Sequence, residues 1–302
     1  MSGPAFVFHP DYEFDIGRHV FPTEKFRLFR DAVVEEGLAT VDAIEYPEKA
    51  TDEELLRVHR PRYLADLRSY SHTGRTLHSE LPISRSIVEG CVRTAGGTLH
   101  AARRALECGA AFHLGGGFHH AFAGRAEGFC YINDVAIAAA WARRVARLDR
   151  VAVIDTDVHQ GNGTAHIFRN DPGVFTFSIH QQRLYPDKQT SRLDIGLDAE
   201  IGDDGYCEAL APAVESIVRD FRPQLALVVA GVDPYEDDKL GRLGLSFAGM
   251  ARRERLTFAP LAAAGIPFVT VTGGGYARRL EDTVALHVQT VRIALDVLAS
   301  ES

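Results

Sequence analysis

Short apolar runs that alternate with longer helical segments are the feature that most restricts how this chain can fold. The apolar runs have the length of buried strands and lie at Ala5–Phe8, Ala111–Leu114, Val151–Ile154, Val174–Ile179, Leu225–Ala230 and Phe268–Val271. Segments with helical periodicity separate them, at Pro22–Glu36, Ser86–Cys108, Asp134–Arg147, Gly205–Phe221, Phe247–Ala264 and Glu281–Ala299. This alternation predicts one α/β domain over residues 1–302, with a mainly parallel central sheet and helices on both faces.

The composition restricts the partners and the setting of the chain. A formal net charge of −8 argues against binding to nucleic-acid backbones, because that requires a basic surface. No apolar window is long enough to span a membrane, and the first residues lack the basic and apolar regions of a signal peptide. None of the cysteines has CxxC spacing, which favours a reducing, cytoplasmic setting; they are Cys91, Cys108, Cys130 and Cys207.

Four of the predicted strands run directly into polar or glycine-rich sequence. The segments that follow these strands are Gly115–His120, Asp155–Gly163, Gly231–Asp233 and Thr272–Tyr276. In parallel α/β sheets, ligands bind beyond the carboxyl ends of the strands. We therefore expect the four segments to meet at one edge of the sheet and to form the functional site there.

The segment after Ile154 contains candidate metal ligands. If the chain stays extended there, residues two apart point the same way, and Asp155, Asp157 and His159 share one face. Aspartate and histidine both bind zinc, and a catalytic zinc site takes three protein ligands and leaves a position for water. Asp233, just past another strand, supplies a further candidate. Any one of these aspartates alone is better explained as a loop cap, but together they favour a metal site. The spacing leaves open which two of Asp155, Asp157 and His159 hold the ion.

Candidate acid–base groups follow the two triple glycines. His119 and His120 form a pair, and a histidine pKa near neutrality suits proton transfer. Tyr276 could direct its hydroxyl at a developing oxyanion, although taken alone it is better explained as an aromatic residue that packs against the following helix. The neighbouring metal candidates make a catalytic role the better interpretation of the histidines.

Four blocks of sequence, in this order and separation, resemble the zinc-dependent histone deacetylase family. The blocks are HLGGGFHHAFAGRAEGFCYINDVAIA, VAVIDTDVHQGNGT, GVDPYEDDKLGRLGLS and VTGGGY. Together they are highly specific and span nearly the whole chain. The GGGFHH block, HQGNG and the stretch Arg93–Thr98 most resemble the class IV branch and its bacterial relatives. The resemblance implies the arginase/deacetylase-like α/β fold.

The resemblance assigns roles to the candidate residues. It implies Asp157, His159 and Asp233 as metal ligands, His119 and His120 as the catalytic histidine pair, and Tyr276 as the oxyanion donor. The implied metal is Zn²⁺, and two carboxylates with one imidazole also suit Fe²⁺.

Other positions are implied to support the histidine pair. Asp155 would orient His119 and, with Ser178 nearby, contribute to a site for a monovalent cation such as K⁺ or Na⁺. Asn162 occupies the position that partners His120, where class I members carry an aspartate, and Gln160 stands where they carry a histidine. An amide does not stabilise an imidazolium as a carboxylate does, so this departure leaves the protonation state of His120 open.

The resemblance also implies a substrate channel. Phe129 matches one aromatic wall, and the carbonyl of Gly128 matches the acceptor for the substrate amide N–H. Tyr185 is our candidate for the opposite wall, and Gly274 is a further candidate contact with the substrate. We find no match for the acidic residue that grips the substrate backbone at the rim in class I members.

These features predict hydrolysis of acyl-lysine amides in a protein or peptide substrate by metal-activated water. One alternative is the deacetylation of small acylated amines such as acetylpolyamines. A binuclear ureohydrolase such as arginase shares the fold, but the tandem histidines and the three-ligand pattern argue against it. A non-catalytic acyl-lysine binding protein is expected to lack a ligand or Tyr276, and none is missing. Acyl-chain preference, natural substrate and oligomeric state are not predicted by the sequence.

Overall fold

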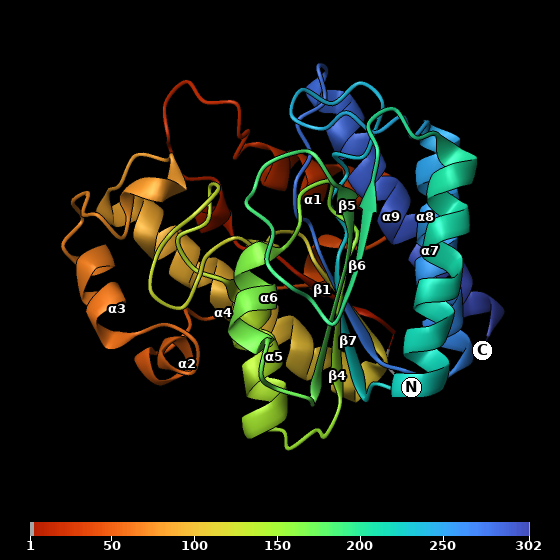
Figure 1. The fold of residues 1–302 in the computed structure, drawn as a ribbon, viewed down its shortest axis with the longest axis horizontal. Coiled ribbons are helices and arrows are strands. Elements are labelled where there is room, and N and C mark those ends of the chain that lie inside the picture. The colour runs from red at the N-terminus through yellow and green to blue at the C-terminus, as the bar shows by residue number, and fades with distance from the viewer. Residues whose placement is uncertain (1–2, 302) are drawn as a thin grey trace.

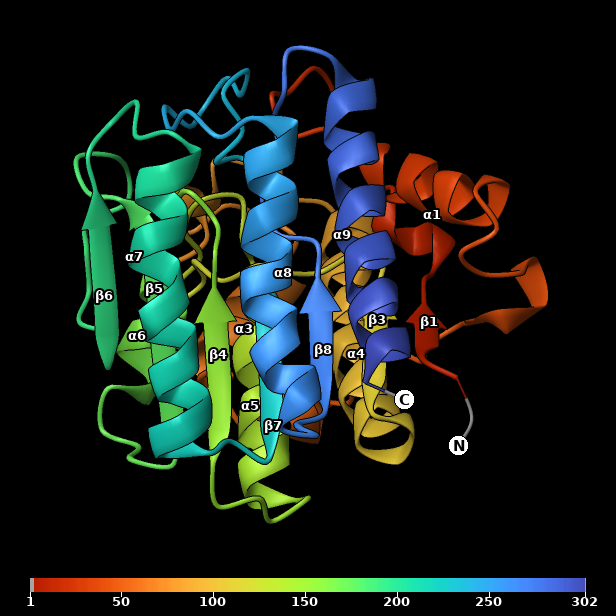
Figure 2. The ribbon, with the colours of Figure 1, turned by 90° about the vertical axis from the view of Figure 1, so that its right-hand side faces the viewer.

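The fold is built on a central sheet of eight strands, all of them parallel. The computed structural model describes residues 3–301. The strands are β1 (Ala5–Val7), β2 (Ile44–Glu45), β3 (Ala110–His113), β4 (Val151–Asp155), β5 (Val174–Gln181), β6 (Leu193–Leu197), β7 (Leu225–Val229) and β8 (Phe268–Val271), in the spatial order β2-β1-β3-β8-β7-β4-β5-β6. The strand arrows point the same way (Figure 2), as the pairing of each neighbouring pair requires. The predicted parallel sheet is confirmed.

Helices cover both faces of this sheet. They are α1 (Lys25–Glu35), α2 (Asp52–Leu56), α3 (Pro61–Arg68), α4 (Arg85–Cys108), α5 (Asp134–Arg144), α6 (Asn162–Phe168), α7 (Asp203–Ser216), α8 (Phe247–Ala263) and α9 (Leu280–Ser300). Helices α7, α8 and α9 lie on one side of the strands, and α4, α5 and α6 lie on the other (Figure 1). The core lies between these layers, and every residue of β7 and β8 is buried. Central strands covered on both faces explain the continuous apolar runs in the sequence.

The elements that the sequence did not predict are short or lie at the edges. Strand β2 has only two residues, and β6 is an edge strand in which only Leu197 is buried. The five-residue α2 is set by a capping box between Thr51 and Glu54 rather than by apolar periodicity. No helix among residues 3–301 combines the length and apolar character that a membrane crossing needs.

The expectation that the chain stays extended from Asp155 to His159 is wrong. Strand β4 ends at Asp155, and residues 157–159 form bends. The backbone N–H of Asp157 donates to Oδ1 of Asp155 at 3.2 Å, and that of His159 donates to Oδ1 of Asp157 at 2.9 Å. Such aspartate-to-backbone bonds two residues apart fold the chain into turns. The three side chains therefore do not share one face of a strand.

A buried histidine connects the outer segment 51–60 to the core. Nδ1 of His59 lies 3.1 Å from the carbonyl oxygen of Phe122, and its Nε2 accepts the backbone N–H of Asn133 at 3.0 Å. This arrangement requires the neutral ring with its proton on Nδ1. Burial lowers the pKa of His59 from 6.5 to about 4.

We predict that acid destabilises the protein through His59. In the unfolded chain the ring takes up a proton at its ordinary pKa of 6.5, whereas the folded ring resists this down to about 4. The stabilisation is therefore complete above 6.5 and is lost as the pH falls through this interval, by roughly 3 kcal/mol at most. Urea unfolding between neutral pH and the acid end of this range measures the loss.

The control for this prediction is His59→Asn, which keeps a donor for Phe122 but has no titrating group. This variant is expected to be less stable at neutral pH and to lose less stability on acidification. An equally steep loss in the variant and the unmodified protein would contradict the role of His59.

Candidate metal centre and catalytic site

The four polar segments that follow predicted strands meet at one edge of the sheet, as expected. Strands β3, β8, β7 and β4 are consecutive in the sheet, so their carboxyl ends lie side by side. The loop after β8 contacts the loop after β3 through a hydrogen bond of 3.1 Å from Gly273 N to Gly116 O. It also contacts the loop after β4, where the N–H of Gly274 donates to Oδ2 of Asp157 at 2.7 Å.

Asp157, His159 and Asp233 form a buried cluster at this edge. One ligand atom from each residue lies within 4.8 Å of the others, and within residues 3–301 no other group of three metal-ligating side chains is found. Nδ1 of His159 lies 3.2 Å from Oδ1 of Asp157 and 3.1 Å from Oδ2 of Asp233. The remaining carboxylate oxygens accept backbone N–H groups, Oδ2 of Asp157 from Gly274 and Oδ1 of Asp233 from Val158 at 2.8 Å. Three ligand atoms therefore face one another while the backbone fixes the carboxylates from behind.

The charges of this cluster suit a divalent cation. Burial and the neighbouring carboxylate of Asp157 raise the pKa of Asp233 to about 7. Burial alone would lower the pKa of His159, but hydrogen bonds to Asp157 and Asp233 raise it to about 10. A proton on His159 thus compensates two buried carboxylates when no metal is bound. Aspartate and histidine are ligands that zinc and iron accept, so the donor set fits either ion.

Gly274 lies against both carboxylates. A Cβ at this position would collide with Oδ2 of Asp233 and would lie 2.7 Å from Oδ2 of Asp157. Its N–H is bonded to Asp157, and its carbonyl oxygen accepts the N–H of Val232 at 2.9 Å. In this structure Gly274 therefore supports the two carboxylates of the cluster, and its contact with a substrate stays a prediction.

The paired histidines lie beside the cluster. Nδ1 of His119 lies 2.7 Å from Oδ2 of Asp155, and its Nε2 lies 3.1 Å from Nε2 of His120. Nδ1 of His120 lies 2.9 Å from Oδ1 of Asn162. The structure thus places Asp155 and Asn162 behind the two histidines, as the sequence implies. The side chain of Asp155 pairs with His119 and is not one of the three that converge in the cluster, which favours Asp157 and His159 as the ligands from this segment.

The two Nε2 atoms require one proton between them. Both Nδ1 atoms face oxygen acceptors and so carry protons, which leaves two lone pairs in contact unless one Nε2 is protonated. Burial lowers the pKa of His119, but the charges of Asp155 and Asp157 raise it to about 9. Burial and the charges of His119 and His159 lower the pKa of His120 well below its usual range. In the metal-free protein the proton therefore resides on His119.

The start of α5 fixes the loop that carries the histidine pair. Asn133 caps the helix through the N–H of Ala136, and its side-chain amide donates to the carbonyl oxygens of His119 at 3.2 Å and Ala121 at 3.0 Å. The adjacent Asp134 accepts the backbone N–H groups of Gly117 at 3.0 Å and Phe118 at 2.8 Å. The loop is thus held on both sides of the pair.

Asp155 and Ser178 face each other across β4 and β5, as the predicted monovalent-cation site requires. Oδ1 of Asp155 accepts the N–H of Asp157, and Oγ of Ser178 lies 3.0 Å from Nδ1 of His180. A monovalent cation at this position stays a prediction.

Tyr276 is buried beside the cluster. Its backbone N–H donates to Asp238 at 2.7 Å, which fixes the loop after β8. Burial, with the charges of Asp233 and Asp157, raises the pKa of Tyr276 well above its usual value. The phenol therefore keeps its proton and can act as a hydrogen-bond donor over the whole neutral range.

A cavity of about 340 Å³ leads from the surface to these groups. It is lined by Glu80, His120, Gly128, Phe129, His159, Leu184, Tyr185, Leu240 and Tyr276. Gly128 and Phe129 both have positive φ, 50° and 63°. A Cβ on Gly128 would lie 2.7 Å from the Tyr185 hydroxyl and 2.8 Å from the His120 ring, so only glycine fits between them. The structure places both predicted aromatic walls, Phe129 and Tyr185, on this channel.

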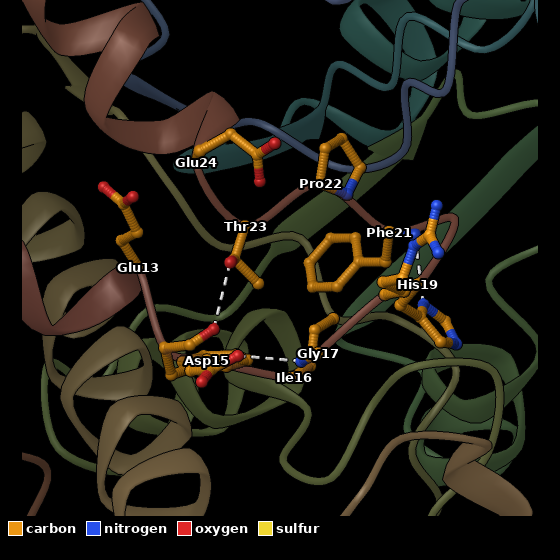
Figure 3. Close-up of a pocket in the computed structure, with 11 residues that line it drawn as sticks. Glu13, Asp15, Ile16, Gly17, His19, Phe21, Pro22, Thr23 and Glu24 are labelled. Carbon is orange, nitrogen blue, oxygen red and sulfur yellow. Dashed lines mark hydrogen bonds between the residues drawn. The ribbon is translucent and has the colours of Figure 1, made fainter.

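A larger cavity, about 670 Å³, lies under the loop 13–24 (Figure 3). The loop is closed by a hydrogen bond of 3.0 Å from Oγ1 of Thr23 to the carbonyl oxygen of Phe14 (Figure 3). Two of its residues contact the channel residue Phe129: the ring of Phe21 stacks on it with centroids 6.0 Å apart, and that of His19 meets it edge-on with centroids 4.9 Å apart. The loop therefore packs behind one wall of the channel.

Sequence reasoning missed several charged residues near the site, including Glu80, Lys25 and Arg253. Glu80 lies at the mouth of the channel, in a left-handed conformation with φ of 62°. Lys25 is fully buried and donates to the carbonyl oxygen of Gly273 at 2.8 Å. Arg253 is also buried, and it donates to the carbonyl oxygens of Thr156 at 3.2 Å and Gly231 at 2.6 Å. The only signal for Lys25 was its place on the buried face of α1, beside Phe26, Phe29 and Val33.

We predict that metal binding displaces a proton from His159. With a pKa raised to about 10, the metal-free imidazole is protonated at neutral pH and must lose that proton before Nδ1 binds an ion. About one proton is released per Zn²⁺ near pH 8, and the apparent affinity rises about tenfold per pH unit. Calorimetric titration with Zn²⁺ in buffers of different ionisation enthalpy counts the protons. A binding enthalpy that does not depend on the buffer would contradict this pairing.

Comparison with known proteins agrees with this geometry. Residues 19–291 match the model of the histone deacetylase domain. The chain is 40% identical over 297 residues to an uncharacterized protein of Picosynechococcus, covering 96% of this chain and 98% of that protein. It is 30% identical over 284 residues to histone deacetylase 2 of Arabidopsis thaliana, covering 90% and 73% of the two chains. It is 31% identical over 294 residues to a probable deacetylase of Archaeoglobus fulgidus, covering 90% and 80%. An all-parallel α/β sheet with this domain match shows that the chain belongs to the histone deacetylase family of hydrolases.

Proposed function

We propose that this protein hydrolyses acyl-lysine amide bonds in proteins or peptides, with Zn²⁺ or Fe²⁺ as its metal. One observation carries the proposal: a buried Asp–His–Asp cluster lies at the inner end of a channel, with a histidine pair and a tyrosine hydroxyl beside it. A channel that leads from the surface to such a cluster suits a long, thin group such as an acylated lysine side chain.

Asp157, His159 and Asp233 are the residues that would hold the ion. When bound, a divalent ion polarises a carbonyl group and lowers the pKa of a water molecule. The neighbouring side chains would then transfer the protons and bind the substrate.

The histidine pair is suited to accept the proton of the attacking water. Its Nε2 atoms are the ones that face each other and the cluster, since both Nδ1 atoms are occupied by Asp155 and Asn162. A bound cation disfavours the proton on His119 that the metal-free carboxylates favour, which frees this nitrogen to act as a base. The pair then returns a proton to the leaving lysine amine, so that it acts first as a base and then as an acid.

Tyr276 is suited to donate a hydrogen bond to the oxyanion that forms when water attacks. Its high pKa keeps the phenol protonated, and the residue lines the channel next to His120 and His159. A donor held in place before the reaction stabilises the transition state without reorganisation. Phe129 and Tyr185 would contact the apolar stem of the lysine, and the carbonyl of Gly128 would accept the amide N–H of the substrate.

A small acylated amine is the second candidate substrate, because acidic residues surround the entrance. Glu80 lines the channel and also an adjoining cavity, which contains Glu127 and Asp187 as well. A second amino group on the substrate would be attracted by these carboxylates. A peptide would instead place its backbone N–H groups against Glu80.

We predict that Tyr276→Phe keeps the metal and loses most of its turnover. Removal of one oxyanion donor lowers kcat roughly 10²–10³-fold, and KM changes little. Metal content by elemental analysis and steady-state kinetics on an acyl-lysine peptide measure the two effects. Tyr46→Phe, at an exposed tyrosine outside the channel, is the matched control. Full turnover by a metal-loaded Tyr276→Phe would refute the oxyanion role.

We predict that Glu80→Ala separates the two substrate classes. If peptides are the substrates, the change raises KM for acyl-lysine peptides about tenfold, because a charge-assisted hydrogen bond to the peptide backbone is lost. Acetylpolyamines would remain poor substrates for both proteins. A panel of peptides with acetyl, lactyl and myristoyl lysine, together with acetylpolyamines, provides the measurement. Efficient turnover of acetylpolyamines alone would refute the peptide proposal in favour of the second candidate.

A further inference from the structure

We propose that Glu127 is a positioning residue, which fixes the orientation and the tautomer of His120 through the side chain of Asn162. The inference rests on the proposed function, since it concerns the proton acceptor of that reaction. Oε1 of Glu127 accepts a hydrogen bond from Nδ2 of Asn162 at 2.7 Å, and Oδ1 of Asn162 faces Nδ1 of His120 at 2.9 Å. A carboxylate thus stands directly behind the amide that contacts the catalytic pair.

The orientation of the Asn162 amide follows from two neighbours that have only one possible role. The backbone N–H of Gly163 is a donor, and it lies 2.9 Å from Oδ1 of Asn162. The carboxylate of Glu127 is an acceptor, and it lies beside Nδ2. The oxygen of the amide must therefore face Gly163 and His120, and its nitrogen must face Glu127.

This orientation determines what His120 can do. An oxygen acceptor at Nδ1 requires the ring proton to be there, so the neutral ring has its lone pair on Nε2. That atom is the one that faces His119, at 3.1 Å. The tautomer with a free Nε2 lone pair is the only neutral form of His120 that can accept a proton inside the site.

Without Glu127, Nδ2 of Asn162 keeps only a 3.5 Å contact with the carbonyl oxygen of Asp187, so the preference for this amide orientation is weakened. A flipped amide would present its NH₂ group to Nδ1 of His120, and the ring would then hold its proton on Nε2. That form cannot accept a proton from water. An aspartate at position 162 would have two equivalent oxygens and therefore no such ambiguity. Glu127 thus compensates for the presence of an amide at position 162.

The backbone of Glu127 is fixed by hydrogen bonds with Cys130, 3.1 Å from Glu127 N to Cys130 O and 2.9 Å from Cys130 N to Glu127 O, and its side chain has an additional outer partner. Its Oε2 accepts hydrogen bonds from Arg125, at 3.1 Å from Nε and 2.8 Å from the terminal nitrogen. Its side chain is only 14% exposed, whereas that of Arg125 is 44% exposed. The two oxygens of Glu127 thus serve different partners, and a variant of Arg125 tests the outer contact separately.

The test compares Glu127→Ala, Glu127→Gln and Arg125→Ala on an acyl-lysine peptide. Loss of the carboxylate in Glu127→Ala is expected to lower kcat about tenfold while KM changes less than about twofold. Glutamine keeps an oxygen that can accept from Nδ2 of Asn162, so Glu127→Gln should retain most of the turnover. Arg125→Ala removes only the outer ion pair and should behave like the unmodified protein.

The decisive comparison uses Asn162→Asp. Two carboxylates would then face each other, and Glu127 would become unfavourable. Adding Glu127→Gln to Asn162→Asp should therefore raise kcat, although the same change in the unmodified protein does not. Equal losses in Glu127→Ala and Arg125→Ala, or no gain in the double variant, would overturn the proposal.

A second readout does not depend on turnover. In protein labelled with ¹⁵N-histidine, His120 should show its proton on Nδ1, and Glu127→Ala should shift this signal toward the Nε2 form. An unchanged tautomer in Glu127→Ala would overturn the proposal. If the unmodified protein hydrolyses no acyl-lysine peptide, the proposed function fails, while the tautomer measurement still decides the role of Glu127.

Discussion

The arrangement of this site depends on two carboxylates that are buried next to each other. Asp157 and Asp233 follow neighbouring strands, β4 and β7, and both side chains are almost completely shielded from water. Burying an unpaired charge is costly, and a second charge of the same sign adds to the cost. Backbone N–H groups from the adjacent loops offset part of it, and the remainder is met by a cation. A proton on His159 fulfils this role in the metal-free protein, and a divalent ion can replace it.

From this cluster a chain of polar contacts extends toward the surface. Asp155 holds His119, His119 contacts His120, and Asn162 connects His120 to Glu127. Both ends of the chain are carboxylates, which can only accept hydrogen bonds. The donors and acceptors between them are therefore directed from both ends toward the two Nε2 atoms in the middle. A site that transfers protons at those atoms needs such fixed neighbours, because an imidazole can otherwise change its tautomer.

The sequence was informative where its signals are local. Apolar runs identified the strands β1, β3, β4, β5, β7 and β8. The segments that follow four of them identified the edge of the sheet where the site lies. The spacing alone did not distinguish the role of Asp155 from that of Asp157, because this depends on bends that hydrogen bonds impose after β4. Glu80 and Glu127 were not predicted as site residues, because their positions depend on how loops pack on one another. Neither residue stands out by spacing or periodicity.

Two buried basic side chains near the cluster bond to other groups and leave its carboxylates free to bind an ion. Lys25 and Arg253 are both buried near Asp157 and Asp233, and either would close the site if it paired with their carboxylates. Instead, Lys25 donates to the carbonyl oxygen of Gly273. Arg253 pairs with the buried carboxylate of Glu254 and also donates to the carbonyl oxygens of Thr156 and Gly231. These carbonyls belong to the loops around the cluster. Both cations therefore hold the loops in place while the carboxylate oxygens of the cluster remain available to a metal, and the charge of Arg253 is compensated by Glu254.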